Sequence, residues 1–155
     1  MRVVIEPNPD AAARFAARCV AEWVTRKPEC VLALAAGTTM VPVYREVVAL
    51  HQRDRVSFAR ARAFDLDEYA GLASDDPRSF ARFVREQVVE QVDFGAGHHF
   101  APDACAADLD AECARYEAAI VSAGGLDLAL LGLGRNGHLA FNEPGASLAG
   151  RTRVE

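Results

Sequence analysis

The sequence has 155 residues, 51% of them hydrophobic, and a formal net charge of −5. This length and composition are enough for the core of one ordinary globular domain, and no hydrophobic run approaches the roughly 20 residues that cross a bilayer. The acidic balance argues against a nucleic-acid partner, because binding to phosphate backbone needs clustered lysine and arginine.

The N-terminal residues predict a strand followed by a helix. Arg2–Ile5 is apolar enough for a first strand and too short for a secretory signal, so we expect a cytoplasmic protein. Asp10 ends a Pro-Asn-Pro-Asp turn and is expected to cap a helix over residues 11–26. The hydrophobic residues at helical spacing predict its buried face: Phe15, Cys19, Val20, Trp23 and Val24.

A second, fully apolar strand is predicted over residues 31–35, with a helix beginning near Pro42. Between them lie Gly37, Thr38 and Thr39. Backbone N–H groups, two hydroxyls and the positive end of a helix would make this loop a site for an anion such as phosphate. The alternative is simpler: a threonine caps the helix after a glycine turn.

A weaker third strand, residues 61–64, runs into three carboxylates in four positions: Asp65, Asp67 and Glu68. Repulsion between neighbouring carboxylates, together with partial burial, raises the pKa of a carboxyl toward that of a useful base. The alternative is a solvated acidic turn without a function.

The next stretch predicts two helices, over residues 77–92 and within residues 103–123, the second with or without a preceding cap segment. His98 and His99 lie between them in a glycine-rich connection and are expected on the surface. The four cysteines have neither zinc-ligand nor C-x-x-C spacing, so we expect no metal site and reduced thiols packed as small hydrophobes. These cysteines are Cys19, Cys30, Cys105 and Cys113.

The apolar run Leu128–Leu131 predicts a strand in the middle of a parallel sheet. The loop after it carries four polar side chains in eight positions: Asn136, His138, Asn142 and Glu143. Its glycines match G-x-G-x-x-G, a dinucleotide-binding pattern, but Pro144 and Gly145 follow too soon for the helix that such a site requires.

Together these elements predict a single α/β domain over residues 1–155. We expect a Rossmann-like, open and mainly parallel sheet with helices on both faces. Open sheets of this kind bind ligands at the carboxyl ends of their strands, where the three polar loops are expected to gather.

Four segments resemble the glucosamine-6-phosphate deaminase family, within the wider superfamily that includes the 6-phosphogluconolactonases. They are L-A-L-A-A-G-T-T (Leu32–Thr39), F-D-L-D-E-Y-A-G-L (Phe64–Leu72), D-A-E-C-A-R-Y-E (Asp110–Glu117) and the stretch from Gly132 to S-L-A-G-R-T-R. The resemblance implies deamination of D-glucosamine 6-phosphate to fructose 6-phosphate and ammonia, without a cofactor. A small amino-sugar phosphate is then the expected partner, and a homo-oligomer is compatible with the sequence.

The resemblance also implies roles for individual residues. His138 opens the sugar ring by moving a proton between O1 and O5, with Asn136 and Glu143 orienting or tuning it. Asp67 takes the proton from C2 and returns it at C1, and residues 37–39 hold the phosphate.

Several features depart from the family pattern. Asn136 stands where many members have aspartate, so weaker or retuned support of His138 is expected. Ser147 and Arg153 match an allosteric region, but Glu155 replaces a lysine there, which implies weak or absent activation by N-acetylglucosamine 6-phosphate. Family members also continue well beyond the position of Glu155. We therefore expect a C-terminally truncated chain whose sheet is incomplete on that side. A catalytically weak sugar-phosphate-binding fragment and a 6-phosphogluconolactonase-like hydrolase remain the alternatives.

Overall fold

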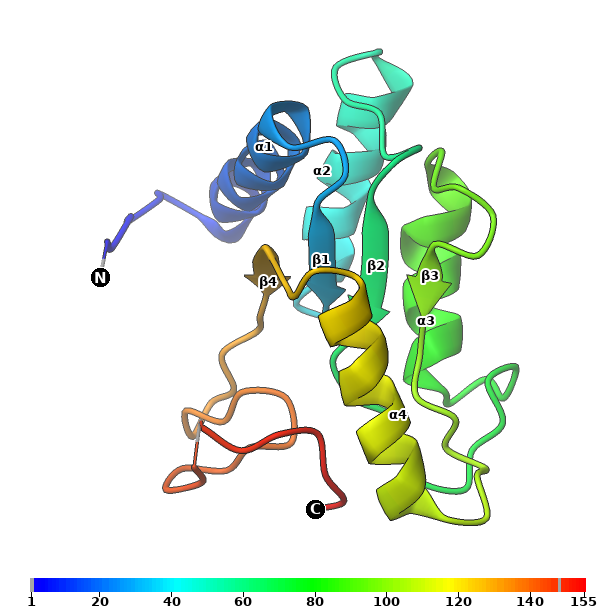
Figure 1. The fold of residues 1–155 in the computed structure, drawn as a ribbon. Coiled ribbons are helices and arrows are strands. Elements are labelled where there is room, and N and C mark those ends of the chain that lie inside the picture. Colours follow the sequence, from blue (N-terminus) through cyan, green and yellow to red (C-terminus); the bar gives the residue numbers. More distant parts are fainter. Residues whose placement is uncertain (1, 148) are drawn as a thin grey trace.

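The computed structural model describes residues 2–147 and 149–155 and contains a parallel four-stranded sheet (Figure 1). The strands are β1 (Val31–Leu34), β2 (Arg62–Asp65), β3 (His99–Phe100) and β4 (Leu128–Leu130), arranged in the order β3-β2-β1-β4. The helices are α1 (Pro9–Arg26), α2 (Val41–Gln52), α3 (Phe80–Gln87), the short 3₁₀ helix η1 (Val89–Gln91) and α4 (Leu109–Ser122).

Helices cover both faces of the sheet, as the alternation of strand and helix predicts (Figure 1). Leu32 and Leu34 of β1 share a buried cluster with residues of α1, α2 and α3. Val31 and Phe64 point the other way and pack with Tyr116 of α4. Successive side chains of a strand alternate between the faces, so β1 and β2 are buried from both sides. The sheet thereby holds the carboxyl ends of its strands at one edge of the core.

Three helices begin where a short polar side chain caps them. Ser79 caps α3 by accepting from the backbone N–H of Arg82, and Asp108 caps α4 in the same way. The predicted cap of α1 is wrong, because the Asn8 side chain accepts from Ala11 N at 2.8 Å and Asp10 lies within the first turn. Asn8 is placed to do so because Pro9 can take the first helical position.

The buried face of α1 differs from the predicted one. Val20 and Val24 are buried, but Trp23 is 38% exposed and Cys19 is exposed. Ala13 and Ala17 are buried in their place. Small side chains let the helix approach its neighbours closely, and this close packing turns the bulky residues outward. The predicted buried face is therefore correct at Val20 and Val24 and wrong at Cys19 and Trp23. Among the cysteines, Cys30 is buried as expected, whereas Cys105 is exposed like Cys19.

Among the described residues β4 lies at the edge of the sheet, as expected for a sheet that is incomplete on its C-terminal side. It pairs with β1, and no strand of the described residues lies on its other side. Leu131, directly after it, is 44% exposed. Arg2–Ile5, by contrast, is not the predicted strand: it pairs with no part of the sheet, and Ile5 is 92% exposed. An apolar run becomes a strand only where a neighbour supplies hydrogen-bond partners.

His98 and His99 are not surface residues. His98 lies just before β3, His99 is the first residue of β3, and both are partly buried. His98 Nδ1 lies 2.9 Å from the carbonyl oxygen of Ala61, which ties β3 to the beginning of β2. No helix in the described parts of the chain is long and apolar enough to cross a membrane.

Candidate functional site

Three polar loops follow three neighbouring strands at the same edge of the sheet. Residues 35–40 follow β1, residues 66–79 follow β2, and residues 131–147 follow β4. We call the second of these the acidic loop and the third the histidine loop. The parallel direction of the strands brings all three loops to the edge where α/β sheets bind ligands.

The three carboxylates at the end of β2 have three different environments. Asp65 is the last residue of β2 and is 2% exposed, and its Oδ1 lies 2.9 Å from His99 Nε2. Burial raises the pKa of Asp65 to about 6, against the opposing effect of the hydrogen bond from His99. This carboxyl is enclosed by the protein.

Glu68 is held by the N-terminus of α3. Its Oε2 accepts from Ser79 Oγ at 2.5 Å and from Ala81 N at 2.9 Å, and its Oε1 accepts from Phe80 N at 3.1 Å. Unpaired N–H groups and the helix dipole favour a carboxylate at this position. The contacts fix the acidic loop to α3 and leave Glu68 little capacity for another partner.

Asp67 stands between these two groups and is the carboxylate left for chemistry. It is partly buried, and within the described parts of the chain it has no hydrogen bond. Burial, together with the negative charges of Asp65 and Glu68, raises the pKa of Asp67 to about 6. A carboxyl group with this pKa is a better base than an exposed aspartate and is still ionised at neutral pH.

The raised pKa of Asp67 predicts a cost in stability. A carboxyl whose pKa is higher in the folded state stabilises that state below its unfolded pKa, and this stability is lost as the pH rises through about 6. Asp67→Asn removes this dependence. The variant should therefore be more stable than the parent at pH 7.5 by about 1–2 kcal/mol, after allowing for partial exposure, and the difference should shrink toward pH 4.5.

Urea unfolding of both proteins at the two pH values measures this difference. Asp75→Asn, which neutralises an exposed carboxylate of the same loop, is the matched control and should show no such trend. An Asp67→Asn variant whose advantage does not change with pH would contradict the raised pKa.

In the histidine loop, Asn136, His138 and Glu143 form a connected trio. Asn136 Nδ2 donates to Glu143 Oε2 at 2.7 Å, and Asn136 Oδ1 lies 2.8 Å from His138 Nδ1. The amide group donates with its nitrogen toward the carboxylate, so its oxygen faces the imidazole. His138 Nδ1 must then carry a hydrogen, and Nε2 of the neutral ring is left as the acceptor. Glu143 and Asn136 thereby fix the tautomer of His138.

Gly134 leaves the space that the His138 ring occupies. A Cβ built at Gly134 would lie 2.3–2.5 Å from three atoms of the imidazole, closer than any stable contact. Gly132, by contrast, would meet Met40 Cε at 3.6 Å, an ordinary contact. The glycine that the trio requires is therefore Gly134.

Gly134→Ala should move the imidazole away from Asn136 while changing the free energy of unfolding by no more than about 1 kcal/mol. The expected signs are a changed Nδ1/Nε2 chemical-shift pattern for His138 in nitrogen NMR and a nearly unchanged urea midpoint. Gly132→Ala is the control and should leave the His138 signals in place. Unchanged His138 signals in Gly134→Ala would show that the ring does not depend on this glycine.

Aromatic rings join the two loops. Tyr69 of the acidic loop lies 5.1 Å from Phe141 of the histidine loop, and both contact Phe80 at the start of α3, with ring centroids 4.8 and 5.9 Å away. Such pairs add about 0.5–1.5 kcal/mol beyond their buried area. The segments that carry Asp67 and His138 are therefore in direct contact.

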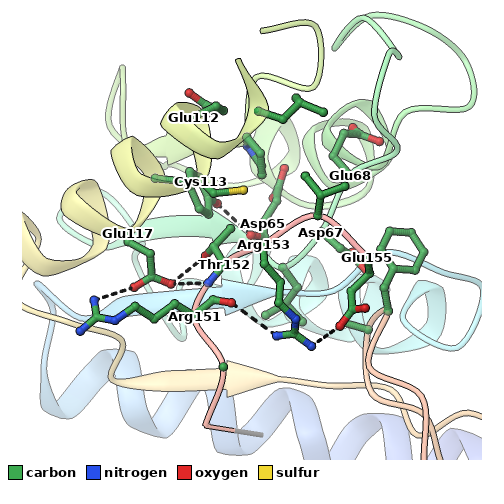
Figure 2. Close-up of a pocket in the computed structure, with 18 of the residues that line it drawn as sticks. Asp65, Asp67, Glu68, Glu112, Cys113, Glu117, Arg151, Thr152, Arg153 and Glu155 are labelled. Atoms are coloured by element: carbon green, nitrogen blue, oxygen red, sulfur yellow. Dashed lines mark hydrogen bonds and ion pairs between the residues drawn. The ribbon is translucent and has the colours of Figure 1, made fainter. Parts of the chain in front are cut away.

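A cavity of about 750 Å³ lies beside Asp67, between the sheet, α4 and residues 150–155 (Figure 2). Of the predicted site residues it is lined by Asp67, Glu143, Ser147 and Arg153. Asn136, His138 and the loop Gly37–Thr39 are not among the residues that line it. The cavity thus connects Asp67 with Glu143, one member of the trio, and convergence of all three loops on one ligand stays a prediction.

The cavity wall is mostly apolar, and its charged residues are mainly carboxylates. Two arginines face it, and both are engaged: Arg151 lies 3.7 Å from Glu117, and Arg153 contacts Glu155 and Asn142 (Figure 2). Its carboxylates are Asp65, Asp67, Glu68, Asp103, Glu112, Glu117, Glu143 and Glu155. This cavity favours a cation over a phosphate group.

The loop after β1 has the properties of an anion site. The residue before α2 is Met40, which makes no side-chain capping bond, so neither threonine caps the helix and that alternative is wrong. Gly37, Thr38 and Thr39 are exposed, and Gly37 has a φ of 113°, which favours glycine. Free N–H groups of a helix N-terminus and two hydroxyls therefore remain available.

The glycine pattern of the histidine loop lacks the helix of a dinucleotide site. Turns and a short bridge between Leu139 and Asn142 follow Gly137, and the described residues after β4 contain no helix. The pyrophosphate of a dinucleotide would have no helix N-terminus to bind in this loop.

Sequence reasoning missed the partners of the two held carboxylates. Ser79 could have been found, because a serine before an amphipathic helix is a common cap. The pairing of His99 with Asp65 could not, because it depends on the register between β2 and β3.

Comparison with known proteins places the chain in a family. The family model described as Glucosamine-6-phosphate isomerases/6-phosphogluconolactonase matches residues 8–148. A glucosamine-6-phosphate deaminase of Mycolicibacterium smegmatis is 46% identical over 155 residues, which is 100% of this chain and 59% of the relative. The chain thus spans about three fifths of the length of that relative.

Two solved structures agree in fold. That of a monomeric glucosamine-6-phosphate deaminase is 42% identical with a TM-score of 0.93, covering 97% of this chain and 63% of that one. A 6-phosphogluconolactonase from Thermotoga maritima is 24% identical with a TM-score of 0.73, covering 90% and 62%, and shares the fold alone. From the sequence match and these likenesses, the chain belongs to the glucosamine-6-phosphate isomerase/6-phosphogluconolactonase family.

Proposed function

We propose that this chain supplies the base and the proton shuttle for deamination of D-glucosamine 6-phosphate to fructose 6-phosphate and ammonia. The observation that carries the proposal is the contact between two loops. One presents Asp67 without a hydrogen-bond partner among the described residues, and the other holds a His138 ring whose tautomer is fixed. Relatives named glucosamine-6-phosphate deaminase that match the whole chain support the same reaction.

Ring opening is assigned to His138. With Nδ1–H directed at Asn136, Nε2 takes the proton from the O1 hydroxyl and delivers it to O5 as the C1–O5 bond breaks. The product of this step is the open-chain aldehyde form of the sugar. Glu143 acts through Asn136, since its carboxylate orients the amide that orients the imidazole.

The isomerisation is assigned to Asp67. The C1 aldehyde makes the C2 proton acidic, and Asp67 removes it. As the C1–C2 double bond forms, a proton passes from the C2 ammonium group to O1, which gives the neutral enolamine. Asp67 returns the proton at C1, which leaves a protonated imine at C2. Water adds to this imine, and ammonia leaves to give the C2 ketone of fructose 6-phosphate. The protons balance without a redox cofactor.

The electrostatics support this orientation of the substrate. An acidic cavity beside Asp67 suits the ammonium group at C2, whereas it would repel a phosphate. The phosphate is assigned to Gly37, Thr38 and Thr39, at the positive end of α2. The ammonium group and the phosphate of the substrate would then lie in regions of opposite electrostatic potential.

Regulation through Ser147 and Arg153 is proposed to be weak or absent. The guanidinium group of Arg153 donates to Asn142 Oδ1 at 2.9 Å and pairs with Glu155. A phosphate effector would have to displace Glu155, which carries the same sign of charge. These contacts support a vestigial effector region.

The test is ammonia release by the purified chain from D-glucosamine 6-phosphate, with fructose 6-phosphate measured as the second product. Equal amounts of the two products are expected. Thermal stabilisation by fructose 6-phosphate without ammonia would instead support a sugar-phosphate-binding fragment. Hydrolysis of 6-phosphogluconolactone without ammonia release would support a lactonase, and neither turnover nor binding would refute the proposal for this chain.

A further inference from the structure

Asp65 is a buried ionisable group to which the proposed reaction gives no role. Its Oδ1 is held by His99 Nε2, but its Oδ2 is fully buried and has no hydrogen-bond partner within the described residues. Leaving a buried carboxylate oxygen unpaired destabilises the folded state. A hydrophobic residue or an amide would fit this position at lower cost, so the charge itself calls for an explanation.

Asp65 and Asp67 line the same cavity (Figure 2). Asp65 is the last residue of β2, and Asp67 follows two positions later. Asp65 is 2% exposed, so little water lies around it to screen its charge. A negative charge at Asp65 therefore acts on Asp67 more strongly than an exposed carboxylate at the same separation would.

The groups around Asp65 leave this effect in place. The ionisable groups near Asp65 come from four other elements and from the acidic loop itself. They are His99 of β3, Arg85 of α3, Tyr44 of α2, Tyr116 of α4 and Glu68 of the acidic loop. The hydroxyl groups of the two tyrosines are turned to backbone carbonyls: Tyr44 donates to Ala35, and Tyr116 lies 2.8 Å from the carbonyl of Asp65. His99 is the group that contacts the carboxylate directly.

We propose that Asp65, held in place by His99, is a positioning residue that sets the proton affinity of Asp67. The inference rests on the proposed role of Asp67 as the base. When two carboxyl groups line the same cavity and little water screens their charges, ionisation of one disfavours ionisation of the other. One member of the pair therefore loses its proton at a lower pH, and the other keeps its proton to a higher pH. The chain obtains a stronger base in this way without burying Asp67 completely.

A purely structural role makes a different prediction. If the Asp65–His99 hydrogen bond serves to hold β3 against β2, its loss lowers stability and leaves the titration of Asp67 as it was. The two roles are separated by observing the Asp67 carboxyl itself.

The experiment is a carbon NMR titration of the Asp67 side-chain carboxyl from pH 3.5 to 8, in the parent chain and in Asp65→Asn. The parent should titrate over a broad range with two steps. In Asp65→Asn the curve should contract to a single step with a midpoint lower by about one pH unit. The amide of asparagine is nearly isosteric, and its oxygen can still accept from His99.

Asp75→Asn is the matched control, since it removes one exposed charge from the same loop, and the Asp67 curve should match that of the parent. Asp65→Ser provides a second neutral variant, with the same expected shift, where Asp65→Asn fails to fold. An Asp67 midpoint that is unchanged in the folded neutral variant, or changed equally by Asp75→Asn, would overturn the inference. The titration needs no turnover, so its result is independent of the ammonia assay.

Discussion

Asp67→Asn is expected to lower the rate of ammonia release from D-glucosamine 6-phosphate by about 10³-fold, near the middle of the range for loss of a general base. Asparagine keeps the shape of the side chain but cannot take the C2 proton. Binding should persist, because the proposed phosphate contacts lie in residues 37–39, so the loss should fall on kcat more than on KM.

A second readout isolates the step that is assigned to Asp67. Ring opening precedes abstraction at C2, so Asp67→Asn should still interconvert the α and β anomers of the substrate, as measured by proton exchange NMR. Asp75→Asn should keep both activities. Ammonia release by Asp67→Asn within a few fold of the parent would mean that another group is the base.

His138→Gln is expected to have the second largest effect, a loss of at least about 100-fold in ammonia release. Glutamine has a donor and an acceptor, but it cannot carry a proton between O1 and O5 near neutral pH. Unlike Asp67→Asn, it should also abolish anomer interconversion by the protein. The two variants together therefore separate ring opening from proton transfer at C2.

His51→Gln is the matched control for His138→Gln. His51 lies near the end of α2, away from the anion loop, with its Nδ1 3.0 Å from the carbonyl of Val56. It should release ammonia like the parent and shift stability by a small amount. If His138→Gln still interconverts the anomers, His138 is not the group that opens the ring. That result would not affect the assignment of Asp67.

Much of this fold follows from short sequence patterns, because apolar runs and helical periodicity depend on residues that are close together in the sequence. The apolar stretch Val31–Leu34 is a strand buried on both faces, and the helices after Pro42 and before Gly124 lie close to where periodicity puts them. Parallel pairing then follows from the alternation of strands and helices. The polar loops consequently lie at the same edge of the sheet, as the sequence predicts.

The failures concern features set by neighbours distant in sequence. Arg2–Ile5 reads as a strand, yet it pairs with no part of the sheet, because a strand needs a neighbour that supplies hydrogen-bond partners. Trp23 reads as core, but small alanines give α1 its contact face. A hydrophobic period identifies a helix and leaves the choice of face to tertiary packing.

In the candidate site, too, the sequence identifies residues, whereas their contacts depend on the folded structure. The sequence picks out Asp67 within an acidic cluster but cannot rank the three carboxylates, since their difference lies in His99 and in the start of α3. Likewise it supplies Asn136, His138 and Glu143, whereas the direction of the Asn136 amide, which fixes the histidine tautomer, comes from the folded loop.

The central claim is that Asp67, His138 and the loop of residues 37–39 act on one bound sugar phosphate. It is tested most directly by titrating isotope-labelled Asp67→Asn with D-glucosamine 6-phosphate, at a concentration of protein where turnover is negligible, and following the NMR signals of residue 67, His138, Thr38 and Thr39. The account predicts that all four shift together with a single dissociation constant. Shifts at the threonines alone, or with a constant different from that of His138, would contradict it.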